Sequence, residues 1–419
     1  MKLPRQGLSR ESVLERMRQR KAADADWRGG RTFSLVYPAG DDVDDLLREA
    51  QLLYLFENAL NPFRFPSLRE MEVDVVDITT DLLHGDEDAS GAMTSGGTES
   101  ILMAAKTARD RARAERGITQ PEMLVPYSAH PAFAKACSYL GIDLVAVPLR
   151  EDRRADAEAA ARLVTDRTVM IMGSAPCYPF GVIDPIEDLA ALAQSHDIHF
   201  HTDACLGGFV LPFFERLGIE VPPFDFRVPG VTTISADVHK YGYATKGASV
   251  IAHRTRRSLH EFQLFKYSDW PGGGYASFAM AGARPAAPIA AAWAVLHFLG
   301  EDGYLRLARK LVDTTRRLRE GRHCRARGVG RARDDALCLR GRARPRPRHL
   351  RRGRRHGCPR LVPRPTDRSR RAAPDDLAGT RAHRGLLPGR PRRSRTSPRT
   401  LEGSRGPLLL SRGAVPQKA

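Results

Sequence analysis

The sequence predicts an α/β fold with a mostly parallel sheet, because short apolar runs alternate with amphipathic segments through residues 1–320. The runs that read as strands lie at 122–126, 143–149, 168–174, 198–204, 232–238 and 248–253. The segments with helical periodicity lie at 98–116, 131–140, 156–165 and 185–196. This alternation is typical of a sheet that is covered by helices on both faces. Two more helices are expected at 285–299 and 304–319, leading toward a smaller terminal domain.

A glycine pair opens the helix expected at 98–116. Gly96 and Gly97 allow the backbone to approach an anion closely, and the hydroxyls of Ser95 and Thr98 stand beside the free N–H groups of the first turn. A cofactor phosphate fits such a site. The alternative is an ordinary helix cap with Glu99 nearby, which binds nothing.

Asp203 ends the strand expected at 198–204, and ligands of open α/β sheets bind at such carboxyl ends. A carboxylate there can pair with the pyridine nitrogen of pyridoxal 5'-phosphate (PLP) and make the ring a strong electron sink. The alternative is that Asp203 caps a helix.

Lys240 follows His239 at the end of the next strand, where a lysine can be fixed and partly desolvated. Its amine is then expected to be neutral often enough to attack an aldehyde. His-Lys alone is a weak signal, but the order of the glycine motif, Asp203 and Lys240 predicts a PLP enzyme.

With these motifs, residues from about 14 to about 320 resemble the sphingosine-1-phosphate lyases, within the group of PLP-dependent decarboxylase-like enzymes of fold type I. The segments that carry the resemblance are 58–62, 94–100, 128–130, 181–185, 201–208, 223–228, 235–247 and 269–277. The run Tyr-Gly-Tyr-Ala-Thr-Lys-Gly after Lys240 separates this family from ordinary amino-acid decarboxylases.

The resemblance implies a role for each matching residue. Lys240 is implied to be the Schiff-base lysine, Asp203 the partner of the pyridinium nitrogen, and His130 the residue that stacks on the ring. The residues implied to bind the cofactor phosphate are Ser95, Gly96, Gly97, Thr98, His239 and, from a neighbouring subunit, the 272–275 loop with Gly273.

Substrate contacts are implied as well. Lys246 is implied to meet the substrate phosphate, with Tyr241 and Asn58 nearby. The alternative for Lys246 is an exposed surface lysine.

Some positions depart from the family pattern. Asn61 stands where the family has a histidine, and Leu35 stands where it has a glycine before the tyrosine at 37. Segments 277–279 and 282–285 match only approximately. The identity of the substrate therefore does not follow from the resemblance.

Composition changes abruptly at Gly321. The 99 residues of 321–419 include 28 Arg, 12 Gly, 11 Pro and 10 Ala and carry a net charge of +23, whereas the whole chain carries +18. The rest of the chain is therefore acidic, and the usual inference from basic charge to nucleic-acid binding does not apply to the enzyme body. This tail is a basic arm that binds nucleic acid, an inert extension, or an out-of-frame translation of a GC-rich gene. We favour the last, because apolar periodicity vanishes where the family's small domain is expected. Reading the gene in its other two frames near codon 320 tests this.

The six cysteines show no C-x-x-C pair or metal-ligand spacing, so no metal is predicted. Reduced thiols, the lack of a signal-like segment and the prolines that interrupt 279–299 favour a cytoplasmic protein without a membrane span. Eukaryotic members of the family carry a membrane anchor.

The resulting hypothesis divides the chain into an N-terminal helical segment (1–57), a PLP-binding large domain (58–300), a connecting helix (301–320) and the tail (321–419). The predicted reaction is retro-aldol cleavage of a phosphorylated amino alcohol to an aldehyde and phosphoethanolamine, by a homodimer with a shared site. The alternatives are an amino-acid decarboxylase and, from the tail alone, a nucleic-acid-binding protein.

Overall fold

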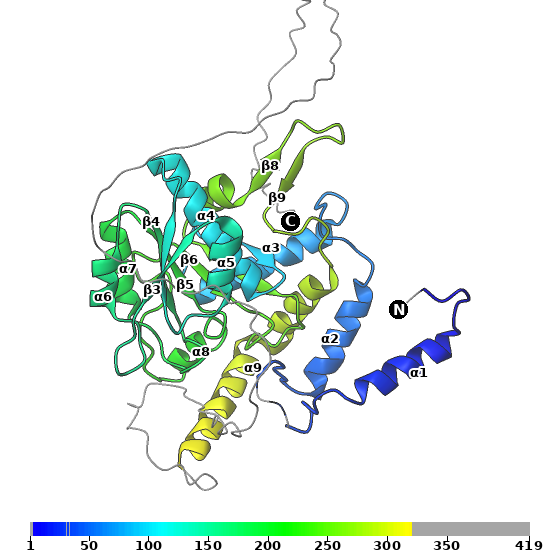
Figure 1. Ribbon diagram of the computed structural model, residues 1–419. Helices are drawn as coiled ribbons and strands as arrows, with labels where there is room; N and C mark the ends of the chain where they lie inside the picture. The colour runs from blue at the N-terminus through cyan, green and yellow to red at the C-terminus, as the bar shows by residue number, and fades with distance from the viewer. Residues whose placement is uncertain (1–2, 31, 33, 321–419) are drawn as a thin grey trace, which may run out of the picture. The chain divides into compact units, whose positions relative to one another are not determined.

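The computed structural model describes residues 3–30, 32 and 34–320 (Figure 1). The hypotheses about the tail, whether a basic arm, an inert extension or an out-of-frame translation, concern residues 321–419, which lie outside the described residues. The domain boundaries placed at 57, 300 and 320 stay predictions.

A seven-stranded sheet forms the centre of the described chain, in the order β1-β7-β6-β5-β4-β2-β3. Its strands are β1 (Ser90–Thr94), β2 (Glu122–Pro126), β3 (Asp143–Val147), β4 (Thr168–Ser174), β5 (His199–Asp203), β6 (Thr233–Ala236) and β7 (Ser249–His253). Strand β7 runs antiparallel to both of its neighbours, and the other strand pairs are parallel. The predicted mostly parallel sheet is confirmed.

Helices cover both faces of this sheet (Figure 1) because its strands alternate between two apolar clusters. On β4, Met170 and Met172 face one cluster and Ile171 faces the other. The first face is covered by α4 (Gly97–Arg116), α5 (Ala132–Leu140) and the π-helix η1 (Ser258–Gln263). The second is covered by α3 (Pro66–Leu82), α6 (Ala157–Leu163), α7 (Ile186–Ser195), α8 (Leu211–Arg216) and α9 (Ala287–Arg319).

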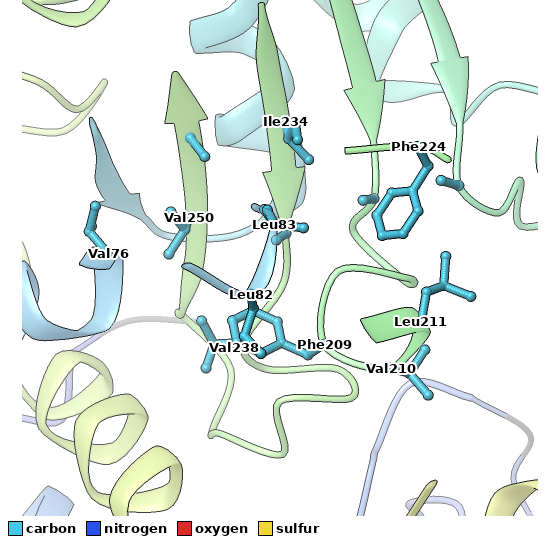
Figure 2. Close-up of a cluster of buried hydrophobic side chains, with 14 of the residues drawn as sticks. Val76, Leu82, Leu83, Phe209, Val210, Leu211, Phe224, Ile234, Val238 and Val250 are labelled. Carbon is cyan, nitrogen blue, oxygen red and sulfur yellow. The ribbon is translucent and has the colours of Figure 1, made fainter. Parts of the chain in front are cut away.

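The second cluster reaches under the strands that hold the site. Figure 2 shows Ile234 of β6 and Val250 of β7 among side chains from the end of α3 and from the 209–211 segment. Phe224, which is fully buried, closes the cluster from the loop that precedes β6. This apolar packing holds the end of β6 in place, and therefore also the start of the segment that follows it.

The last described helix joins the two helices expected at 285–299 and 304–319. Gly300, with φ 54° and ψ −174°, interrupts α9 between them. Helix α2 (Asp41–Leu53) packs against α9, whereas α1 (Arg10–Lys21) has no buried residue. A hairpin of β8 (Phe265–Tyr267) and β9 (Tyr275–Ser277) extends from the body (Figure 1). Among the described helices, none has the length and hydropathy that a membrane span needs.

Candidate active site

A cavity of about 530 Å³ lies at the carboxyl ends of the parallel strands. Its walls come from segments that follow β1, β2, β4, β5 and β6, because parallel strands end at the same edge of a sheet. The register pairs Ser174 with Asp203 and Asp203 with Ser235, so the ends of β4, β5 and β6 lie side by side. The residues predicted to hold the cofactor that line it are Ser95, Gly96, Gly97, Thr98, His130, Asp203, His239 and Lys240.

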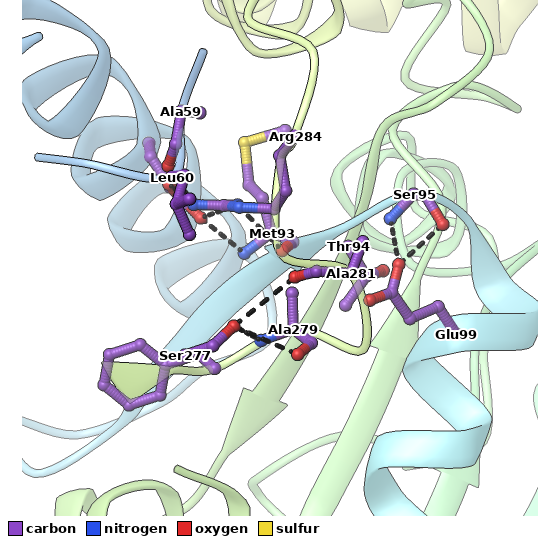
Figure 3. A network of polar contacts seen from close by, with 12 residues as sticks. Ala59, Leu60, Met93, Thr94, Ser95, Glu99, Ser277, Ala279, Ala281 and Arg284 are labelled. Atoms are coloured by element: carbon purple, nitrogen blue, oxygen red, sulfur yellow. Dashed lines mark hydrogen bonds and ion pairs between the residues drawn. The ribbon is translucent and has the colours of Figure 1, made fainter. Parts of the chain in front are cut away.

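The first turn of α4 is open to an anion. No described residue accepts from the backbone N–H groups of Gly97 and Thr98, and no side chain caps the helix. The hydroxyl of Ser95 is occupied, since it donates to Glu99 Oε2 at 2.6 Å and the Ser95 N–H donates to the same oxygen at 2.7 Å (Figure 3). Ser95 therefore bonds Glu99 and does not cap the helix, as the predicted alternative would require, and the N-cap residue is Gly96.

Gly97 brings this turn against the strand ends. A Cβ at Gly97 would lie 2.6 Å from Cys205 Sγ and 2.9 Å from either oxygen of Asp237. No larger residue fits without a shift of the carboxylate. The glycine is needed for close packing, which the motif alone did not reveal.

Asp203 is held by one of its two oxygens. Oδ1 accepts from the Cys205 N–H at 3.1 Å and from Ser235 Oγ at 3.2 Å. Oδ2 accepts from no described residue, and Asp203 lines the cavity. One carboxylate oxygen is thus available to a ligand.

Lys240 is paired with a carboxylate that the motif analysis missed. Its Nζ lies 2.9 Å from Asp237 Oδ2, and Asp237, 2 % exposed, has a second oxygen without a partner in the described chain. Burial acts to lower the pKa of Lys240, but the nearby negative charges outweigh it and raise the pKa. Cys205, Asp237 and Asp203 all act to raise this pKa, and Asp237 also pairs directly with the ammonium group. The expectation of a frequently neutral amine is wrong for this structure: Lys240 is an ammonium ion at neutral pH.

Two histidines adjoin the cavity in defined tautomers. His130 Nδ1 accepts from the Ala132 N–H at 3.2 Å, which leaves Nε2 to carry the proton of the neutral ring. His239 Nδ1 donates to the Ala248 carbonyl oxygen at 2.7 Å, and burial lowers the pKa of His239. His239 Nε2 is therefore an acceptor at neutral pH.

Lys246 also lines the cavity, beside an aromatic group. Its Nζ donates to the His239 carbonyl oxygen at 2.7 Å and lies 5.2 Å from the ring centroid of Tyr37. Tyr241 contacts Tyr37 edge to face at 5.1 Å but does not line the cavity. Lys246 is exposed overall, as the alternative for it expects, although partial burial lowers its pKa.

Asn58 and Gly273 lie away from this cavity. Asn58 Oδ1 accepts from the N–H groups of Leu60 at 3.0 Å and Arg284 at 3.1 Å, so the side chain joins two loops. Arg284 in turn binds both oxygens of Glu72 at 2.8 Å. Gly273 stands at the turn between β8 and β9. Their implied roles in substrate and cofactor binding stay predictions.

An N-terminal segment forms a wall that the motifs did not predict. Ser34, Leu35 and Tyr37 line the cavity, and Ser34 Oγ lies 3.1 Å from the hydroxyl of Tyr178, another lining residue. Leu35 has φ 67°, in the left-handed region that favours glycine. The glycine that the family has at this position was the available signal, since it indicates a left-handed turn.

The residues present fit PLP. An open helix N-terminus suits its phosphate, the free oxygen of Asp203 suits its ring nitrogen, and Lys240 offers an amine to its aldehyde. The unpartnered buried oxygen of Asp237 shows that this polar site is not saturated by the protein itself.

Comparison with known proteins agrees with this reading. Residues 3–327 match the family model of the pyridoxal-dependent decarboxylase conserved domain. Sphingosine-1-phosphate lyase 1 of Rattus norvegicus is 45 % identical over 318 residues, which are 76 % of this chain and 56 % of the relative. The Arabidopsis thaliana sphingosine-1-phosphate lyase is 46 % identical over 327 residues, covering 76 % and 60 %. The chain thus spans under two thirds of the length of these curated relatives.

A solved structure extends the likeness to three dimensions. The sphingosine-1-phosphate lyase of Burkholderia pseudomallei has a TM-score of 0.72 and 42 % identity, over 75 % of this chain and 74 % of that one.

Proposed function

Because the chain belongs to the pyridoxal-dependent decarboxylase family, and within it to the sphingosine-1-phosphate lyases, we propose that it is a PLP-dependent aldehyde-lyase. The proposed substrate is a phosphorylated amino alcohol such as sphingosine-1-phosphate, cleaved between Cα and Cβ to an aldehyde and phosphoethanolamine. The observation that carries the proposal is the meeting of Lys240, Asp203 and the first turn of α4 in one cavity.

Each residue has a distinct part in this proposal. The N–H groups of Gly97 and Thr98 bind the cofactor phosphate, and the free oxygen of Asp203 holds the ring nitrogen in its protonated state. His130 orients the ring, and Lys240 provides the amine that retains the cofactor. When bound, PLP supplies the electron sink for cleavage of the carbon–carbon bond.

Lys246 is proposed to bind the phosphate of the substrate. The proposal is supported by its position at the cavity wall, next to Tyr37 and six residues after Lys240. The carbonyl of His239 holds its ammonium group in place at 2.7 Å, so a ligand phosphate meets an oriented donor.

A homodimer with a shared site is proposed as well. Its support is the hairpin that carries Gly273, on which Phe265, Tyr267 and Trp270 are each about half exposed. Apolar side chains of this size on a projecting hairpin suit burial against a second copy. A cytoplasmic location is proposed from the free thiols of Cys137 and Cys177.

Replacement of Lys240 tests the proposed chemistry. Lys240→Ala is expected to abolish turnover and the visible absorption of bound PLP, while weak binding persists through the amides of Gly97 and Thr98. Lys135→Ala is the control, because Lys135 is an exposed residue of α5. Unchanged absorption in Lys240→Ala rejects the assignment of the lysine.

A product assay tests the reaction class. With sphingosine-1-phosphate the protein is expected to release an aldehyde, and with amino acids it is expected to release no carbon dioxide. Release of carbon dioxide from an amino acid, without aldehyde from the phosphorylated substrate, favours the decarboxylase alternative.

A further inference from the structure

An unusual polar row lies on the inner face of β5 and β6, beneath the cavity. Alternate residues of β5 on this face are His199, His201 and Asp203, and those of β6 opposite them are Thr233 and Ser235. All five are buried, although this face otherwise packs against the apolar cluster under α4 and α5. Most buried polar groups in proteins are satisfied by hydrogen bonds.

The five side chains form one continuous series of hydrogen bonds. His199 Nε2 lies 2.8 Å from Thr233 Oγ1, which lies 2.9 Å from His201 Nδ1. His201 Nε2 lies 3.2 Å from Ser235 Oγ, which lies 3.2 Å from Asp203 Oδ1. The series ends at the carboxylate proposed to hold the cofactor nitrogen.

Counting protons fixes the direction of every bond in this series. An ionised Asp203 can only accept, so Ser235 spends its single proton on it and must accept from His201 Nε2–H. His201 is fully buried and neutral, because burial lowers its pKa to about 4, so its Nδ1 is an acceptor. Thr233 therefore donates to His201 Nδ1 and accepts from His199 Nε2–H.

The surroundings leave Ser235 no other arrangement. Its oxygen also receives the S–H of Cys205 at 3.3 Å, which fills its second lone pair. A hydroxyl that has one donor and two acceptor sites in use cannot rotate without breaking a bond. The series is thus saturated at the residue that contacts Asp203.

We propose that Ser235 and His201 are positioning residues for Asp203, through a one-way hydrogen-bond chain that starts at His199 and Thr233. The chain fastens Oδ1 and so turns the free Oδ2 of Asp203 toward the cofactor site. This inference rests on the proposed function for its purpose, but the chain itself is a property of the protein without cofactor.

The hydrogen-bond chain is tested first in the protein without cofactor. Nitrogen-15 NMR of the histidine rings is expected to show His201 as the neutral Nε2–H tautomer at pH 7. Ser235→Ala removes the acceptor of that proton and is expected to shift the Nε2 resonance, whereas Thr202→Val is expected to leave it in place. Thr202 is the matched control, since it is buried on the same strand and its hydroxyl has no partner in the described chain. If His201 of the wild-type protein is instead the Nδ1–H tautomer or carries a charge, the proposed direction of the hydrogen-bond chain is wrong.

The effect on Asp203 is tested by PLP binding. Ser235→Ala is expected to raise the PLP dissociation constant about tenfold, the net worth of one hydrogen bond to a charged group. Ser235→Thr keeps the hydroxyl and is expected to restore most of the affinity, and Thr202→Val is expected to leave it unchanged. In the pair Ser235→Ala and His201→Leu the two effects are expected to be less than additive, because both act through one bond.

The outcomes separate the two proposals. If His201 is the Nε2–H tautomer in the wild-type protein but that protein does not bind PLP, the proposed function is refuted. The proposed hydrogen-bond chain is still supported in that case. PLP binding that is equal in wild type, Ser235→Ala and Thr202→Val refutes the positioning role.

Discussion

Replacement of Asp237 by Asn removes one of the charges that raise the pKa of Lys240, while it preserves the shape of the side chain. Lys240 Nζ then loses its ion pair at 2.9 Å, and burial, which acts in the opposite direction, gains weight. A charge at such a distance moves a pKa by about 1 to 3, which corresponds to about 1.4 to 4 kcal/mol. The pKa of Lys240 is therefore expected to fall by this amount.

The direction has a functional consequence. An amine must be neutral to attack an aldehyde, so at a given pH its reactive fraction rises about tenfold for each unit by which its pKa falls. Asp237→Asn is thus expected to load PLP onto Lys240 faster near pH 8 than the wild-type protein does. Any step after PLP attachment that needs the Asp237 carboxylate is expected to be slower in this variant.

Competitive acetylation at a series of pH values, read by mass spectrometry of the peptide that contains Lys240, measures the change in the protein without cofactor. Wild-type Lys240 is expected to react only at a pH above the usual range of a lysine, and the variant is expected to react at a pH lower by about 1 to 3. Lys135 serves as the internal reference in each sample because it is exposed. An unchanged or higher midpoint for Lys240 in Asp237→Asn refutes the electrostatic argument.

Three further results are expected. Asp203→Asn retains PLP attachment, seen as visible absorption, but cuts turnover greatly because a neutral amide cannot hold the ring nitrogen protonated; near-normal turnover contradicts this role. Burial lowers the pKa of His201 and His253 to about 4, so the unfolded state takes up protons first and the folded state loses stability as pH falls from 6.5 toward 4. Between pH 7 and pH 5 this amounts to about 2 kcal/mol for each ring, and a urea midpoint that does not change over this interval excludes it. Sedimentation is expected to find a dimer, and a fully active monomer argues against a site shared through Gly273.

The sheet was predictable where strands are apolar on both faces. The bounds expected at 122–126 and 168–174 are those of β2 and β4, because each is a continuous buried run. Strand β1 was missed because Ser90, Gly91 and Ala92 are weak strand formers. It forms by pairing with β7, whose backbone approaches so closely that a Cβ on Gly91 would lie 2.6 Å from the Ile251 carbonyl oxygen.

The sequence predicted the residues that are proposed to contact the cofactor, but not the residues that contact those side chains in the fold. Lys240 and Asp203 follow strands and stand in recognisable motifs, and the structure brings both to one cavity. Asp237 is three residues before the lysine in a turn, and only the fold shows that its carboxylate is buried against the ammonium group. Likewise, Ser235 gives no signal in sequence, because its partner Asp203 comes from another strand.

The reversed direction of β7 has a consequence for engineering. If the strand after β6 were parallel to it, a long crossover, usually a helix, would have to connect the two strands. Because β7 returns antiparallel, residues 237–248 form one short connection that carries both Lys240 and Lys246. A single contiguous segment thus carries both lysines that line the cavity. Exchange of these twelve codons between relatives is expected to transfer the proposed cofactor attachment and the proposed phosphate recognition together.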